Sequence, residues 1–235
     1  AYSIALALDA QDHGEGQVQK DAIDLIALLT PINKAFLTDR GLECSNIGVQ
    51  VFGGHGFISE HGMEQIVRDV RISLLYEGTN GIQANDLIGR KLAGSKGQLV
   101  RKYIDQAEEF CAAISANSTL APFAETLKTH LQEWWQLSQL MLARGKEDPN
   151  FVATAAVDYQ EYSGYVVLAY LWARMAAVAA DKLANGTNEE AFYKAKLATA
   201  RFYYNRLLPR TRSLVVTMQA GAETVMALSE EEFVF

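Results

Sequence analysis

The sequence predicts an all-α fold: a partial helical bundle followed by a second, antiparallel helical bundle. Ala, Leu, Glu, Gln and Lys dominate the 235 residues, and only four prolines occur. Apolar residues recur at helical spacing along most of the chain, and no stretch shows the convincing alternation of a half-buried strand. Short glycine- and proline-containing loops separate long amphipathic segments, which indicates antiparallel neighbouring helices.

The first bundle begins with an apolar helical pattern that residues 12–16 interrupt. The pattern resumes over residues 17–29. Thr30 and Pro31 then predict a new helix, with Thr as N-cap and Pro at the first helical position. We expect this helix to run to about Phe52. Its buried side is expected to carry Ile32, Phe36, Ile47 and Val51.

Glycines in residues 53–56 are expected to end that helix, because glycine readily adopts the left-handed conformation. A short helix is expected from about Met63 to Arg71. A connector that contains Glu77 follows, and a further helix is expected from Thr79 to about Ala93.

The glycine pair in residues 94–97 predicts a domain boundary, with domains at 1–97 and 98–235. The third helix of the second domain is apolar almost all round, so we expect it to be central. Residues 230–235 are expected to be a frayed tail or an edge contact. The helices expected in this domain span about 98–116, 121–144, 150–184, 188–208 and 211–228.

Composition excludes several classes of function. The net charge is −7 and the pI is about 5.2, with no basic cluster, so binding to nucleic acid or an anionic membrane is not expected. No signal peptide or long apolar run is evident, which predicts a soluble, cytoplasmic chain without membrane insertion. Cys44 and Cys111 are expected to be buried, reduced thiols. His55 and His61 lack carboxylates at ligand spacing, so no metal site is expected.

Glu77 is the most informative residue, because it places a carboxylate in the otherwise uncharged stretch 72–82. Gly78 allows the backbone to approach a ligand, and Thr79 is a plausible N-cap. A carboxylate on a short connector before a helix can point into a cleft. It can equally be a solvated turn residue that the helix dipole favours, and the residues alone leave both interpretations open.

Two blocks of residues resemble the C-terminal helical domain of acyl-CoA dehydrogenases. The first is Gln-Val-Phe-Gly-Gly-His-Gly-Phe at 50–57, and the second runs from Arg-Asp-x-Arg-Ile to Tyr-Glu-Gly-Thr-Asn-x-Ile-Gln at 68–83. They occur in the family's order and at its separation. The residues after 97 resemble the C-terminal extension of larger bacterial members, which include the methylmercaptopropionyl-CoA dehydrogenase type.

The resemblance implies FAD-dependent formation of a double bond between the α- and β-carbons of an acyl-CoA thioester. A base takes the α-proton while hydride passes to flavin N5, and Glu77 matches that base. Tyr76 and Gly78 match positions that line the acyl pocket. Gly81 departs from the pattern, since many members carry Gln there. The implied cofactor-binding residues are Gln50, Val51, Phe52, Gly53, Gly54, Thr79, Asn80 and Gly81.

The resemblance also implies partners and a larger protein. Residues 50–54 would approach an FAD bound mainly by a neighbouring subunit, so a homo-oligomer is expected, with electron-transfer flavoprotein as acceptor. We expect the chain to be a fragment that lacks the other flavin-holding domains and is inactive alone. An acyl-CoA oxidase is a rival interpretation. A non-enzymatic, DNA-associated homologue is another, but it predicts a basic extension, and residues 98–235 contain no basic run.

Overall fold

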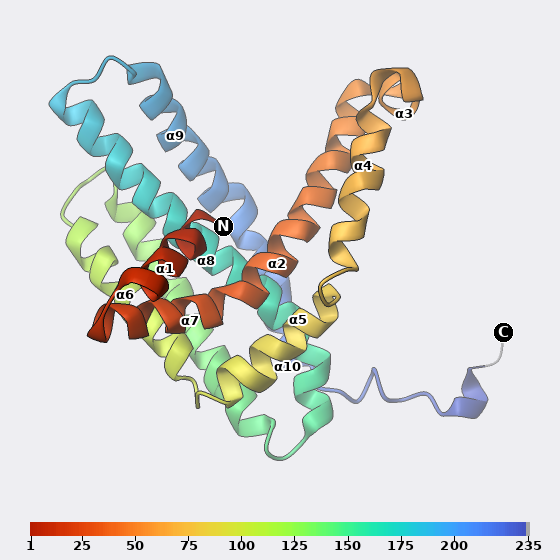
Figure 1. Cartoon of the computed structure of the whole chain (residues 1–235). Helices are drawn as coiled ribbons and strands as arrows, with labels where there is room; N and C mark the ends of the chain where they lie inside the picture. Colours follow the sequence, from red (N-terminus) through yellow and green to blue (C-terminus); the bar gives the residue numbers. More distant parts are fainter. Residues whose placement is uncertain (234–235) are drawn as a thin grey trace. The chain divides into compact units, whose positions relative to one another are not determined.

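The computed structural model describes residues 1–233, and that part is helical without strands, which confirms the expected fold class (Figure 1). The chain forms two compact units, Ala1–Lys91 and Leu92–Phe235. Val234 and Phe235, at the end of the expected tail, lie outside the described residues. The first unit contains α1 (Tyr2–His13), α2 (Gly16–Phe52), α3 (Gly54–Phe57), α4 (Met63–Arg71) and α5 (Asn80–Asp86), with 3-10 turns at Ser59–His61 and Ile72–Leu74. A π-helical turn, Leu87–Ala93, follows α5.

The long helix α2 is continuous through Pro31, so the prediction of a new helix at Thr30 was wrong. A proline inside a helix lacks one N–H donor and usually bends the helix, and Figure 1 shows α2 changing direction along its length. Leu28 and Ile32 are buried on either side of the proline, so packing holds both halves in place. The Thr30 hydroxyl does not cap a helix but donates a hydrogen bond to the Ile26 carbonyl at 2.7 Å.

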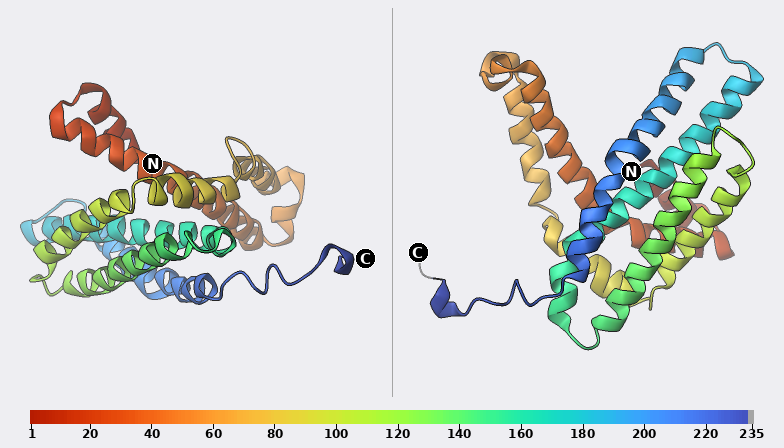
Figure 2. Two further views of the ribbon diagram at one scale, coloured as in Figure 1. Left: turned by 90° about the horizontal axis from the view of Figure 1, so that it is seen from below. Right: turned by 180° about the vertical axis from the view of Figure 1, so that it is seen from behind.

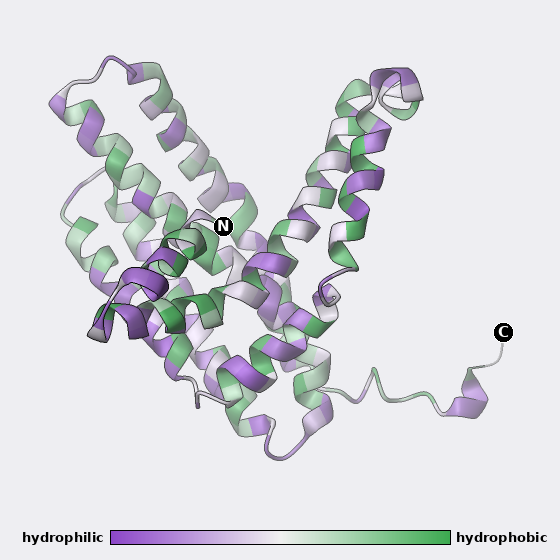
Figure 3. Cartoon of the chain, viewed as in Figure 1, coloured by the Kyte–Doolittle hydropathy of each residue, from purple (hydrophilic) through white to green (hydrophobic). Residues whose placement is uncertain are grey.

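Helix α4 packs beside the second half of α2, and Figure 2 shows the two helices side by side in both views. The fit is close, because a Cβ at Gly48 would lie 2.6 Å from Met63 Cε. Ile47 and Val51 were expected to be buried, but they are 54% and 78% exposed. Since α4 covers one side of this part of α2, apolar residues stay uncovered on another, and Figure 3 shows apolar colour along this hairpin.

The second unit is built around α8, which contacts α7, α9 and α10 and is central, as expected. The helix expected at 188–208 continues from α9 through a π-helical and a 3-10 turn. The last helix ends at Gln219 instead of residue 228, because Gly221 has a positive φ of 81° and the following apolar residues are largely exposed. The helices are α6 (Gln98–Ile114), α7 (Ala121–Arg144), α8 (Pro149–Asn185), α9 (Glu190–Phe202) and α10 (Thr211–Gln219).

Helix α8 is long and apolar enough to cross a membrane, contrary to the expectation that no such run exists. Half of its most apolar window is buried inside the structure, and three helices of the same unit pack against it. The same composition is typical of the core helix of a helical bundle.

Tyrosine hydroxyls link the helices in the core of the second unit. Tyr162 donates to Glu133 Oε2 at 2.6 Å. Tyr203 and Tyr204 donate to the carbonyls of Tyr165 and Ala169 at 2.7 and 2.9 Å. Burial raises the pKa of Tyr162 and of Tyr204, so both remain protonated donors at neutral pH. These bonds tie α7 and the turn after α9 to α8 and satisfy the buried hydroxyls that make them.

The two cysteines differ in accessibility. Cys111 is buried as expected, whereas Cys44 is exposed, so the prediction for Cys44 was wrong. Burial raises the pKa of the Cys111 thiol to about 11, which keeps it protonated and unreactive at pH 8. We expect a thiol reagent at pH 8 to modify one cysteine in the native chain and two in denaturant. Peptide mapping should locate the native label on Cys44, and rapid native labelling of Cys111 would contradict the packing described here.

Candidate functional site

A cleft of about 680 Å³ opens in the first unit between α2 and the segment from the Glu77 connector to the π-helical turn. The α2 side contributes mainly apolar groups, and the opposite side contributes carboxylates, amides and two cations. Such a mixture suits a ligand with an apolar part and a polar part. The lining residues are Ile26, Ala27, Thr30, Pro31, Glu77, Gly78, Ile82, Gln83, Asn85, Asp86, Arg90 and Lys91.

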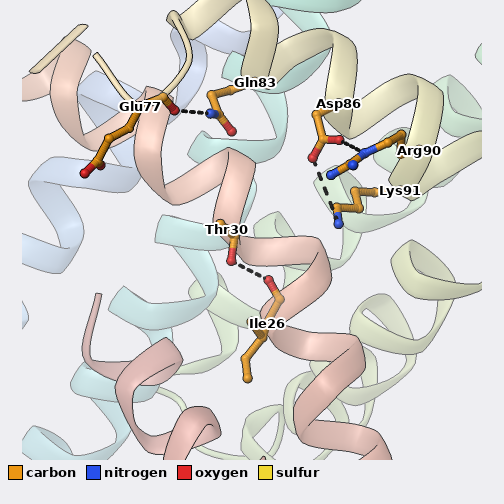
Figure 4. A network of polar contacts seen from close by, with 7 residues as sticks. All are labelled: Ile26, Thr30, Glu77, Gln83, Asp86, Arg90 and Lys91. Carbon is orange, nitrogen blue, oxygen red and sulfur yellow. Dashed lines mark hydrogen bonds and ion pairs between the residues drawn. The ribbon is translucent and has the colours of Figure 1, made fainter. Parts of the chain in front are cut away.

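Glu77 lies on the connector at the edge of this cleft with its backbone in the left-handed region, at φ 56°. That conformation costs a non-glycine residue about 1–2 kcal/mol. The side chain is exposed, and in Figure 4 it extends away from Gln83. Its carboxylate has no hydrogen-bond or ion-pair partner among residues 1–233. The carboxylate is therefore unpaired within the described part of the chain.

Gly78 follows Glu77 with a φ of 81°. A Cβ added there would lie 3.0 Å from Gln83 Nε2, and that amide donates a hydrogen bond to the Glu77 carbonyl at 3.0 Å. Any side chain at Gly78 would therefore be strained and would press on this bond. The sequence alone pointed to Gly78 for close ligand approach, but it did not reveal Gln83 as the residue that holds the connector.

A charged cluster also lines the cleft. Asp86 pairs with Arg90, and Lys91 lies 4.0 Å from the second Asp86 oxygen (Figure 4). The cluster carries one net positive charge. Sequence reasoning missed it, although the i,i+4 spacing of Asp86 and Arg90 on a helix would have indicated the pair.

The residues expected around Glu77 lie on its connector or in the first turn of α5. Thr79 is the N-cap of α5, as predicted, and its hydroxyl accepts a hydrogen bond from the Ile82 N–H at 3.4 Å. Tyr76 is 51% exposed. Gly81 is exposed and offers only backbone. The side chain of Asn80 turns to α2, where Lys34 Nζ donates to its Oδ1 at 2.8 Å.

The other expected group, Gln50 to Gly54, lies at the far end of α2. Gly53 caps that helix with φ 60°, and a Cβ at Gly53 or Gly54 would meet no atom within 4 Å. Asn80 contacts Asp39, and the helical stretch from Asp39 to Gln50 covers roughly 16 Å at about 1.5 Å per residue. Within one chain the two groups are therefore separated along α2 by this length.

No group of three potential metal ligands occurs within the described part of the chain. The rings of His55 and His61 meet edge to face, with centroids 5.0 Å apart. This contact links α3 to the 3-10 turn that precedes α4.

Two family models match the chain. Residues 5–92 match the model described as acyl-CoA dehydrogenase, C-terminal domain. Residues 103–229, more than half of the chain, match the model described as acetyl-CoA dehydrogenase C-terminal like. The first match contains the cleft and Glu77, and the second covers most of the second unit.

Curated relatives cover the chain over most of its length. A 3-methylmercaptopropionyl-CoA dehydrogenase of Ruegeria pomeroyi is 33% identical over 86% of the chain and 34% of its own length. A butyryl-CoA dehydrogenase of Syntrophomonas wolfei is 28% identical over 97% of the chain and 37% of its own length. A broad-specificity linear acyl-CoA dehydrogenase of Mycobacterium tuberculosis is 28% identical over 91% of the chain and 36% of its own length. The chain thus spans little more than a third of the length of these relatives.

Proposed function

The chain belongs to the acyl-CoA dehydrogenase family, and from that premise we propose that it is the C-terminal part of an enzyme that oxidises an acyl-CoA thioester to the α,β-unsaturated thioester. In this proposal residues 1–97 are part of the family's C-terminal helical domain, and 98–235 are an additional helical domain. The observation that carries the proposal is Glu77: an unpaired carboxylate at the edge of a cleft, within the matched domain.

The proposed role of Glu77 is to take the α-proton of the thioester. The carbon–hydrogen bond breaks, its electrons form the α,β double bond, and hydride leaves the β-carbon. FAD, when bound, would supply the acceptor for that hydride. Gly78 and Tyr76 would line the acyl chain beside the carboxylate, and the left-handed backbone at Glu77 would fix the direction of its side chain.

The chain's residues fit FAD in part. The open backbone at Gly53 and Gly54 admits close approach of a large polar group, and the Gln50 amide can donate and accept hydrogen bonds. The Thr79 hydroxyl already accepts a hydrogen bond as the N-cap of α5, and Gly81 has only backbone groups with which to contact a cofactor. These contacts are few, so we propose that other parts of a larger protein hold most of the cofactor and that this chain alone is inactive.

Assembly is a second part of the proposal. Because Gln50–Gly54 lies at the C-terminal end of α2 whereas Glu77 lines a cleft beside the middle of that helix, the former would serve the flavin of a neighbouring subunit in a homo-oligomer. Exposed apolar residues on the α2–α4 hairpin support such a contact, since apolar area of this kind favours association. They include Ile47, Val51, Phe52, Phe57 and Ile66. We further propose a bacterial cytoplasmic enzyme that passes its electrons to electron-transfer flavoprotein.

A test starts with the full-length protein that contains these residues. We expect bound FAD and acyl-CoA-dependent reduction of an electron-transfer flavoprotein or an artificial acceptor. The substrates to assay first are butyryl-CoA, longer linear acyl-CoAs and 3-methylmercaptopropionyl-CoA, which the relatives' names suggest. Stoichiometric oxygen consumption would show an oxidase instead. Absence of both flavin and acyl-CoA oxidation would refute the proposal.

A further inference from the structure

The connector that carries Glu77 is strained and exposed, so something must hold it in place. Glu77 and Gly78 both have positive φ angles, 56° and 81°, and the Glu77 side chain has no partner of its own within residues 1–233. The Gln83 amide holds the Glu77 carbonyl, but Gln83 belongs to α5. That bond therefore fixes the connector only relative to α5, and α5 in turn must be fixed to α2, the opposite wall of the cleft.

Asn80, the first residue of α5, makes that attachment. Lys34 Nζ donates to Asn80 Oδ1 at 2.8 Å, and Asn80 Nδ2 donates to Asp39 Oδ1 at 2.8 Å. The amide oxygen thus faces a cation and the amide nitrogen faces an anion. Both bonds are charge-assisted, and exchanging the oxygen and nitrogen would oppose both charges. The orientation of Asn80 is therefore fixed.

Further contacts surround the same amide. Thr38 Oγ1 lies 3.1 Å from Asn80 Nδ2 and 3.3 Å from Oδ1, and the Ala35 carbonyl accepts from Nδ2 at 3.4 Å. All the side chains involved are half-buried, so water competes less with these bonds than it would at the surface. We call Lys34, Thr38, Asp39 and Asn80 the Asn80 clamp.

We propose that Asn80 is a positioning residue: the clamp fixes the start of α5 on α2 and thereby holds the Glu77 carboxylate at the reacting carbon. This inference rests on the proposed role of Glu77. It assigns the Asn80 side chain to α2, so any contact of Asn80 with a cofactor would come from its backbone. Since a displacement of about 1 Å at a reacting group can cost on the order of 100-fold in rate, loosening the clamp should lower turnover.

The chemistry of the clamp supplies its own test, because donor and acceptor can be exchanged. Asn80→Asp places a carboxylate against Asp39, and Asp39→Asn removes the anion that Asn80 donates to. The double variant restores both bonds, because the new carboxylate at position 80 accepts from Lys34 and from the new amide at position 39. The matched control is the exposed pair Asp181 and Asn185 on α8, joined by a similar 2.9 Å bond. Its variants are Asp181→Asn, Asn185→Asp and both together.

Two readouts separate the clamp from the proposed function. In the 235-residue chain we expect backbone amides of residues 75–81 to exchange hydrogen about 10-fold faster or more in each single variant and near the wild-type rate in the double variant. In the flavin-loaded full-length protein we expect kcat to fall roughly 10- to 100-fold in the single variants, with KM for acyl-CoA changed less than about 3-fold, and to recover in the double variant. The control variants should change neither readout.

Unchanged exchange in both single variants would overturn the clamp, whatever the activity. Faster exchange that the double variant does not reverse would also overturn it, because the Asn80–Asp39 bond would then not be the cause. Faster, reversible exchange with unchanged kcat would overturn the positioning role. If wild-type protein does not oxidise any acyl-CoA, the proposed function fails, whereas the exchange measurement still decides whether the clamp holds the connector.

Discussion

Glu77→Gln should leave FAD content unchanged and lower kcat of the full-length protein by about 100- to 10,000-fold, the usual contribution of a positioned general base. The amide has nearly the shape of the carboxylate but cannot accept the α-proton. Because the Glu77 side chain has no partner among the described residues, the substitution breaks no contact, and the thermal stability of the protein should stay the same. The comparison needs steady-state kinetics, flavin absorbance and a melting curve on the same preparations.

Glu60→Gln is the matched control, since Glu60 is exposed in the first unit and does not line the cleft. It should behave as the wild type. A Glu77→Gln variant that retains a tenth or more of wild-type turnover would show that another group is the base.

Trp134→Ala should destabilise the chain by about 3–5 kcal/mol, the cost typical of removing a large aromatic side chain from a core. Trp134 is fully buried and meets Tyr103 edge to face, with ring centroids 6.0 Å apart. The neighbouring Trp135 is half-buried, with the Arg101 guanidinium over its ring at 5.4 Å. Urea unfolding of both alanine variants, followed by circular dichroism, measures the difference. Equal losses of stability would contradict the assignment of Trp134 to the core and Trp135 to its rim.

The sequence predicted the helical fold well because apolar periodicity and glycine-containing stops determine helices locally. Sequence-based prediction was wrong where tertiary packing determines whether a helix continues and which of its residues are buried. Pro31 was expected to begin a helix, but buried residues on both sides hold α2 together through it. Ile47 and Val51 follow the apolar periodicity of α2, yet α4 covers only part of that helix. Periodicity shows which face is apolar, but it does not show what covers the face.

In the candidate site, too, local features could be predicted from the sequence, whereas contacts between distant residues could not. The Thr79 cap and the placement of Glu77 and Gly78 on a connector before a helix could be predicted, because turn chemistry involves consecutive residues. The role of Glu77 as base stays a prediction. The Asn80 clamp could not, since Asp39 lies 41 positions from Asn80 in sequence. Half-buried polar contacts between distant residues have no periodic signal, and a lone Lys or Asp on a helix usually reads as a solvated charge.

Anaerobic mixing of an acyl-CoA with the flavin-loaded full-length protein tests the role of Glu77 most directly, because it isolates proton and hydride removal from reoxidation. The visible absorbance of oxidised flavin should bleach within a single turnover in the wild type. In Glu77→Gln the same bleaching should be slower by about 100-fold or more, with substrate still bound. Bleaching at the same rate in both proteins would contradict the assignment of Glu77 as the base.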